Sequence, residues 1–129
     1  MAVYRILSLD GGGVRALLQV KALQALYPQE TAKGHDVLEK FDLVAANGGG
    51  CVVLAGLLSN KPLASIVDEV FRNEKQRRQL FAPTPWFNLH NRLFRGTQYS
   101  TNMKLEGFRS ILEEYAKMTL PTLFTSLRR

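Results

Sequence analysis

The sequence has little of what marks secreted, disulfide-linked or membrane-spanning proteins. It contains one cysteine, Cys51, which excludes an internal disulfide bond and fits a reducing compartment. No apolar run approaches the ~20 residues that a helix needs to cross a bilayer. The apolar start is interrupted by Arg5 and ends at Asp10, which does not suit a signal peptide. These absences predict a cytoplasmic protein without a transmembrane segment.

Length and composition indicate a globular chain. At 129 residues it is one domain or part of one, and its apolar content of 46% suits a packed core and argues against disorder. There is no internal repeat, low-complexity segment or Gly/Ser linker. Two short, continuous apolar runs predict buried strands at residues 3–9 and 41–45. Apolar residues at helical spacing predict helices over residues 14–27, 51–58, 62–78 and 105–115.

The order strand, helix, strand, helix predicts a right-handed βαβ unit in an α/β fold, with a parallel sheet covered by helices on both faces. Residues 6–9 and 43–45 should be neighbouring strands whose carboxyl ends meet. Residues 14–27 are apolar around much of the helix and should be well buried, whereas residues 79–103 should be irregular. Because two parallel strands make a poor sheet, we expect residues 1–129 to be the amino-terminal part of a larger domain.

Positive charge is concentrated in the second half of the chain. The formal net charge is +6, of which residues 65–129 contribute +5, and four of their cations lie within residues 72–78. Such a region suits phosphate head groups or nucleic acid, although a solvated surface is the simpler interpretation. We expect at most a weak, salt-sensitive contact with an anionic membrane, and no nucleic-acid partner.

Each predicted strand runs into a glycine-rich turn. Residues 10–15 read DGGGVR and residues 46–50 read ANGGG. Turns of this kind, followed by a helix, aim backbone N–H groups at an anion. The second turn has the frame of a nucleophile elbow, G-x-S-x-G, which lifts a serine out of the sheet. Here Gly48 occupies the serine position.

The first turn suits the stabilisation of an oxyanion. In acyl transfer, negative charge builds on the carbonyl oxygen, and fixed backbone N–H donors lower the barrier. Gly11, Gly12 and Gly13 let the backbone approach a substrate without obstruction by a Cβ atom. Arg15 can anchor this loop or pair with a phosphate.

The two turns together resemble patatin-like phospholipases. Residues 10–15 are similar to the family's D-G-G-G-x-R-G loop, and residues 41–50 (FDLVAANGGG) are similar to its F-D-x-x-x-G-x-S-x-G elbow. The resemblance implies hydrolysis of fatty acyl esters or phospholipids by a serine–aspartate dyad, without metal or organic cofactor. It assigns the oxyanion hole to Gly11–Gly13 and the nucleophile position to residue 48. It also implies supporting roles for Asp10, Arg15, Ala16, Ala46 and Gly50.

The departures from the family pattern concern catalysis. Gly48 offers no hydroxyl for covalent catalysis, and no D-G-[AG] motif, which carries the family's aspartate further along the chain, follows the elbow in these residues. Ala16 and Ala46 stand where the family usually has glycine, which is a milder change. We therefore expect this chain to be inactive as an ester hydrolase.

Other candidate side chains have simpler interpretations. Cys51 lies one turn beyond the elbow and should pack in the core, as should the hydroxyl of Ser8. Asp10 should hold its turn by accepting N–H bonds. Surface or loop roles are expected for both histidines and for the aromatic pair of the irregular segment, which are His35, His90, Trp86 and Phe87.

Two alternatives remain open from the sequence. Gly11, Gly13 and Ala16 satisfy the dinucleotide-binding pattern G-x-G-x-x-A, but the acid expected at the end of the second strand is missing and Asp42 lies at its start. That interpretation also leaves the second turn unexplained. The other alternative is a non-catalytic homologue that binds lipid or a protein partner.

Overall fold

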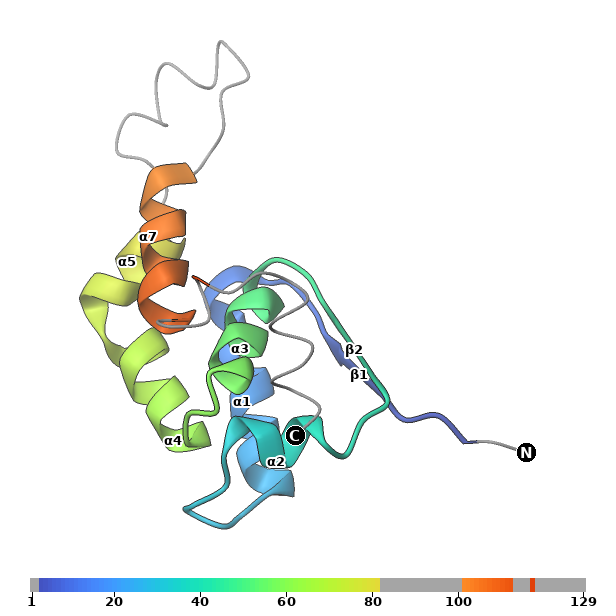
Figure 1. Ribbon diagram of the computed structural model, residues 1–129. Coiled ribbons are helices and arrows are strands. Elements are labelled where there is room, and N and C mark those ends of the chain that lie inside the picture. The colour runs from blue at the N-terminus through green and yellow to red at the C-terminus, as the bar shows by residue number, and fades with distance from the viewer. Residues whose placement is uncertain (1–2, 82–100, 113–116, 118–129) are drawn as a thin grey trace.

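The computed structural model describes residues 3–81, 101–112 and 117 (Figure 1). Two strands, a 3₁₀ turn (η1), a π-helix (η2) and six α-helices are described. In chain order they are β1 (Ile6–Leu9), η1 (Gly13–Ala16), α1 (Leu17–Leu26), α2 (Gly34–Leu38), β2 (Leu43–Ala46), α3 (Gly49–Leu58), α4 (Leu63–Ile66), η2 (Val67–Arg72), α5 (Glu74–Phe81) and α7 (Thr101–Leu112).

The two strands pair in parallel, which confirms the α/β class and the predicted strand neighbours. Ile6 lies opposite Leu43, and Leu9 lies opposite Ala46. The ladder closes with a hydrogen bond of 3.1 Å from the Asn47 N–H to the Leu9 carbonyl oxygen. Because both strands end at the same edge of the sheet, the two glycine turns emerge side by side.

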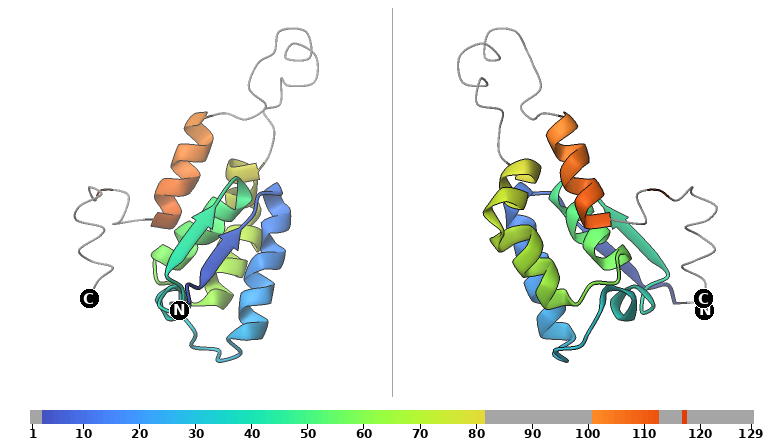
Figure 2. Two further views of the ribbon diagram at one scale, coloured as in Figure 1. Left: turned by 90° about the vertical axis from the view of Figure 1, so that its right-hand side faces the viewer. Right: turned by 60° about the vertical axis from the view of Figure 1, so that its left-hand side comes forward.

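Within the described residues, the helices lie on one face of the sheet, as the left view of Figure 2 shows. Leu7 and Leu9 of β1 point toward the helices, and Leu9 is only 2% exposed. Ile6 and Leu43 point the other way and are 60% and 57% exposed. The expectation of helices on both faces is therefore not met in this part of the chain. Successive side chains of each strand alternate between the covered and the exposed face, so the strands are not buried along their whole length.

The core lies where α1, α3 and α4 pack together. Val20, Val53, Leu57 and Ile66 are all fully buried there. Burying each such side chain stabilises the fold by about 1.5–3 kcal/mol. The predicted burial of residues 14–27 is wrong in extent, because Leu18 and Leu26 of α1 are 70% and 71% exposed. Only one face of α1 meets α3 and α4, so its remaining apolar residues face outward.

The predicted helix over residues 62–78 is interrupted at Asn73. Its α-helical start, α4, gives way to the π-helix η2, and Asn73 then adopts an extended conformation with ψ 112°. The Asn73 Oδ1 atom accepts a hydrogen bond of 3.2 Å from the Gln76 N–H, so Asn73 caps α5. The basic residues Lys75, Arg77 and Arg78 consequently belong to a separate helix. Residues 79–81 and 101–103 are also helical, which corrects the irregular segment predicted there.

Helix α2 was not predicted from the sequence. It is held at its start by the Asp36 carboxylate, which accepts a hydrogen bond of 2.8 Å from the Lys33 N–H. His35 joins α2 to the end of α3, because its Nε2 atom lies 2.9 Å from the Leu58 carbonyl oxygen. Five residues are too few to show a helical period, and packing against α3 decides the conformation.

Asp42 fixes the amino-terminal ends of the two strands. Its carboxylate accepts a hydrogen bond of 2.8 Å from the Arg5 N–H, and its own N–H donates to the Arg5 carbonyl oxygen, also at 2.8 Å. We expect Asp42→Ala to lower the free energy of unfolding by about 1–2 kcal/mol, because the Arg5 N–H loses a charged acceptor. Asp68→Ala is the matched control. It removes an exposed ion pair to Arg72 and should cost less than about 0.5 kcal/mol. Equal losses in chemical denaturation would contradict this role.

Candidate active site

The second glycine turn adopts a sharp strand-to-helix geometry centred on Gly48. This residue has φ 48° and ψ −119°, a conformation that side chains rarely adopt. Hydrogen bonds from the Gly50 N–H to the Asn47 carbonyl (2.8 Å) and from the Cys51 N–H to the Gly48 carbonyl (3.2 Å) tighten the turn into α3. The backbone is therefore held in a strained strand-to-helix turn with glycine at its apex, the backbone shape that a nucleophile elbow requires.

The elbow faces the first glycine turn directly. A Cβ atom built on Gly48 would lie 3.3 Å from the Cα atom of Gly11, so a side chain at position 48 would point toward that turn. The small residues Gly50 and Ala16 allow α3 to pack closely against the end of β1 and against η1. Gly50 packs against the Leu9 carbonyl at the end of β1, and Ala16 is buried beneath the start of α3. Ala46 ends β2 and is half-buried.

A pocket of about 190 Å³ opens where the two turns meet. Four glycines from both turns form one part of its wall, and side chains from α3, α5 and α7 form the rest. We call it the elbow pocket, and it is lined by Gly12, Gly13, Gly48, Gly49, Val52, Leu80, Phe81, Lys104 and Phe108. Gly11 lies behind the wall, against Gly48 and Asn47. Apolar walls and convergent backbone groups are typical of small-molecule sites.

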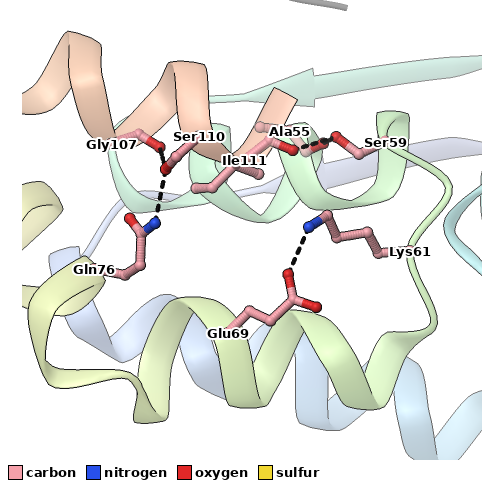
Figure 3. Close-up of polar contacts among 8 residues, drawn as sticks. All are labelled: Ala55, Ser59, Lys61, Glu69, Gln76, Gly107, Ser110 and Ile111. Carbon is pink, nitrogen blue, oxygen red and sulfur yellow. Dashed lines mark hydrogen bonds and ion pairs between the residues drawn. The ribbon is translucent and has the colours of Figure 1, made fainter. Parts of the chain in front are cut away.

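Two polar contacts, drawn in Figure 3, attach helix α7 to the helices beside this pocket. The Ser59 hydroxyl at the end of α3 lies within hydrogen-bond distance of the Ala55 and Ile111 carbonyl oxygens, at 2.9 and 2.8 Å. The Gln76 amide of α5 donates to the Ser110 hydroxyl at 2.7 Å. These contacts hold α7 against α3 and α5, and so place Lys104 and Phe108 at the pocket.

The hydrogen bonds of Asp10 in the first glycine turn differ from the prediction that its side chain accepts N–H bonds. The Asp10 carboxylate accepts a hydrogen bond of 3.2 Å from the Ser8 hydroxyl, and the Asp10 carbonyl accepts one of 2.5 Å from the Gln19 side-chain amide. Ser8 is exposed, so its interpretation as a core hydroxyl is wrong. Ser8 is exposed because it lies on the face of β1 that no described helix covers. The contact of Gln19 with this turn was not predicted, although a polar residue within an apolar helix indicates a hydrogen-bonding role. Arg15 is exposed on η1.

The remaining candidates stay outside the pocket. Cys51 is half-buried on α3, and His35 serves the α2–α3 contact. His90, Trp86 and Phe87 lie outside the described residues. Among the described residues, no three His, Cys, Asp or Glu side chains are placed to hold a metal ion. No helix in the same part of the chain is long and apolar enough to cross a membrane.

The basic segment is partly neutralised along its own helices. Arg72 pairs with Asp68 at 2.7 Å, and Arg78 pairs with Glu74 at 2.6 Å, each four residues apart. All four side chains are more than half exposed, so these pairs contribute little to stability. The predicted contact of residues 72–78 with an anionic membrane stays a prediction.

Comparison with known proteins agrees with this geometry. Over 62 residues the chain is 36% identical to "Intracellular phospholipase A2" of Caenorhabditis elegans, an alignment that covers 48% of this chain and 6% of that protein. The chain thus spans a small part of the curated relative that it matches. No solved structure matches it. The family profile of the Patatin-like phospholipases matches residues 7–128. Over nearly its whole length, therefore, the chain belongs to the patatin-like phospholipase family of lipid hydrolases.

Proposed function

We propose that residues 1–129 are the amino-terminal part of a lipid acyl hydrolase domain that has lost its nucleophile. In this proposal the elbow pocket accepts an acyl ester, and the chain binds the ester without cleaving it. The observation that carries the proposal is the strained turn at Gly48, which would aim a side chain at the first glycine turn.

Each part of the pocket has a role in this proposal. The N–H groups of the first turn, at Gly11–Gly13, would donate to the carbonyl oxygen of the ester as it gains negative charge. The apolar side chains Val52, Leu80 and Phe108 would contact the acyl chain. Position 48 would carry the attacking oxygen in a relative that has serine there. Glycine at this position removes the covalent step and leaves the binding groups intact.

The second candidate is a homologue whose role is to bind lipid or a protein partner, rather than a hydrolase domain that has lost its nucleophile, and Gly48 is the observation that favours it. A dinucleotide site is less well supported. Asp42, the nearest acid, lies at the amino-terminal end of β2 and bonds to Arg5, whereas ligand sites of α/β folds lie outside the carboxyl ends of the strands.

Covalent labelling tests the absence of catalysis. The protein that carries Gly48 should show no labelling by a fluorophosphonate probe and no burst of acyl-enzyme with a p-nitrophenyl ester, because both need a nucleophilic oxygen. A patatin-like phospholipase with serine at its elbow is the positive control. If the Gly48 protein hydrolyses the ester at a rate comparable to that control, residue 48 is not the nucleophile position.

A further inference from the structure

A second hollow shares a wall with the elbow pocket. It has a volume of about 430 Å³ and is lined by Val14, Arg77, Arg78 and Phe81. We call it the arginine hollow. Phe81 also lines the elbow pocket, so the two spaces are neighbours along this side chain. A ligand that passes Phe81 would contact the glycine turns at one end and Arg77 and Arg78 at the other.

The shared wall is fixed in place. The Phe81 ring stacks on the ring of Phe71, with the centroids 5.8 Å apart and the ring planes inclined by 19°. Arg77 and Arg78 precede Phe81 by four and three residues on α5, so all three side chains project from neighbouring positions on the helix surface. Val14 closes the hollow from η1, the element that follows the first glycine turn.

The charge of the arginine hollow suits a phosphate. Guanidinium groups bind phosphate oxygens through two parallel N–H bonds, which a single ammonium group cannot do. Glu74 pairs with Arg78 at 2.6 Å. Both side chains of that pair are more than half exposed, at 71% and 64%, so a phosphate can displace the carboxylate at little cost.

We propose that Arg77 and Arg78 bind the phosphate of a glycerophospholipid whose acyl ester occupies the elbow pocket, and so make the chain select anionic phospholipids over uncharged acyl esters. The inference rests on the proposed function, because it needs the acyl ester in the elbow pocket. In a glycerophospholipid, the ester carbonyl and the phosphate are joined by the short glycerol backbone, which suits two neighbouring sites that share Phe81 in their walls. Arg77 and Arg78 are thus specificity-determining residues rather than catalytic ones.

Binding of short-chain monomeric lipids tests this inference, because the Gly48 chain should leave them intact. Titration calorimetry below the micellar concentration would compare dihexanoyl phosphatidylglycerol, dihexanoylglycerol and glycerol phosphate. We expect the phospholipid to bind about tenfold more tightly than dihexanoylglycerol, since a charged hydrogen bond typically contributes at least that factor. The double variant Arg77→Gln/Arg78→Gln should lose this advantage and keep its affinity for dihexanoylglycerol. Arg72→Gln, which removes one positive charge outside the hollow, should change neither affinity.

If the chain binds dihexanoylglycerol, three outcomes would overturn the inference. The first is an unchanged advantage of the phospholipid in the double variant, and the second is an equal loss in Arg72→Gln. The third is glycerol phosphate binding as tightly as the whole lipid, which would indicate a site for a free phosphate ester. Failure of the proposed function looks different, because dihexanoylglycerol would then not bind even to the unmodified chain. If the phospholipid then still bound and its binding depended on Arg77 and Arg78, the two arginines would form an anion site unconnected to the elbow pocket. That result would also overturn the inference.

Discussion

Gly48→Ser is expected to restore labelling by a fluorophosphonate and hydrolysis of a short acyl ester, in a chain that also carries the family's downstream D-G-[AG] aspartate. The rate should rise by at least about a thousandfold, because loss of a serine nucleophile lowers kcat by about a millionfold in a well-studied protease. The hydroxyl would enter a turn already shaped to present it, 3.3 Å from Cβ to the Gly11 Cα atom. In the 129-residue chain alone the same change should restore little, because the aspartate is absent.

The restored side chain should also cost stability. A residue with a Cβ atom at φ 48° is strained, and such strain typically costs about 1–3 kcal/mol. Gly48→Ala is the matched control, because it introduces the same backbone strain without a hydroxyl. Both variants should therefore unfold at a lower denaturant concentration than the parent, and only the serine variant should react. Labelling of the alanine variant would show that another residue reacts with the probe.

Gly50→Ala is expected to destabilise the fold by about 3 kcal/mol or more, at the upper end of what overpacking costs. A Cβ atom there would overlap the Leu9 carbonyl oxygen and would lie 3.0 Å from the Asp10 carbonyl oxygen. Both atoms belong to the backbone where β1 enters the first glycine turn. They can move only if the turn moves, so the substitution should distort the elbow pocket as well as lower the stability.

Gly56→Ala provides the comparison within the same helix. A Cβ atom at this buried position of α3 would meet Ile66 side-chain atoms at 3.0–3.1 Å, and these can shift by a few tenths of an ångström. The higher helix propensity of alanine, about 1 kcal/mol, offsets part of the crowding. We expect a net change within about 1 kcal/mol, measured by chemical denaturation alongside Gly50→Ala. Similar losses of stability in both variants would show that crowding against the backbone at Gly50 costs no more than crowding against a side chain at Gly56.

The local pattern of the sequence was sufficient for the centre of the fold. Continuous apolar runs and the turns that follow them predicted both strands, their parallel pairing and helix α3 except for its first two residues, because strand, turn and helix propensities act over a few neighbouring residues. Asn73 shows a local signal that was overlooked. An asparagine followed by Glu74 is a typical helix start, yet the apolar spacing before it continued smoothly and predicted one long helix.

Only the tertiary structure decided which surfaces meet. The apolar residues Leu18 and Ile6 look like core residues in the sequence, and both are exposed because no described element packs on their side. Lys104 and Phe108 join the elbow pocket from a helix that begins more than fifty residues after Gly48, held there by Ser59 and Gln76. The sequence alone determined the two glycine turns and the glycine at position 48. Long-range packing determined the pocket around them, because periodicity along a chain reports which face is apolar but not which partner covers it.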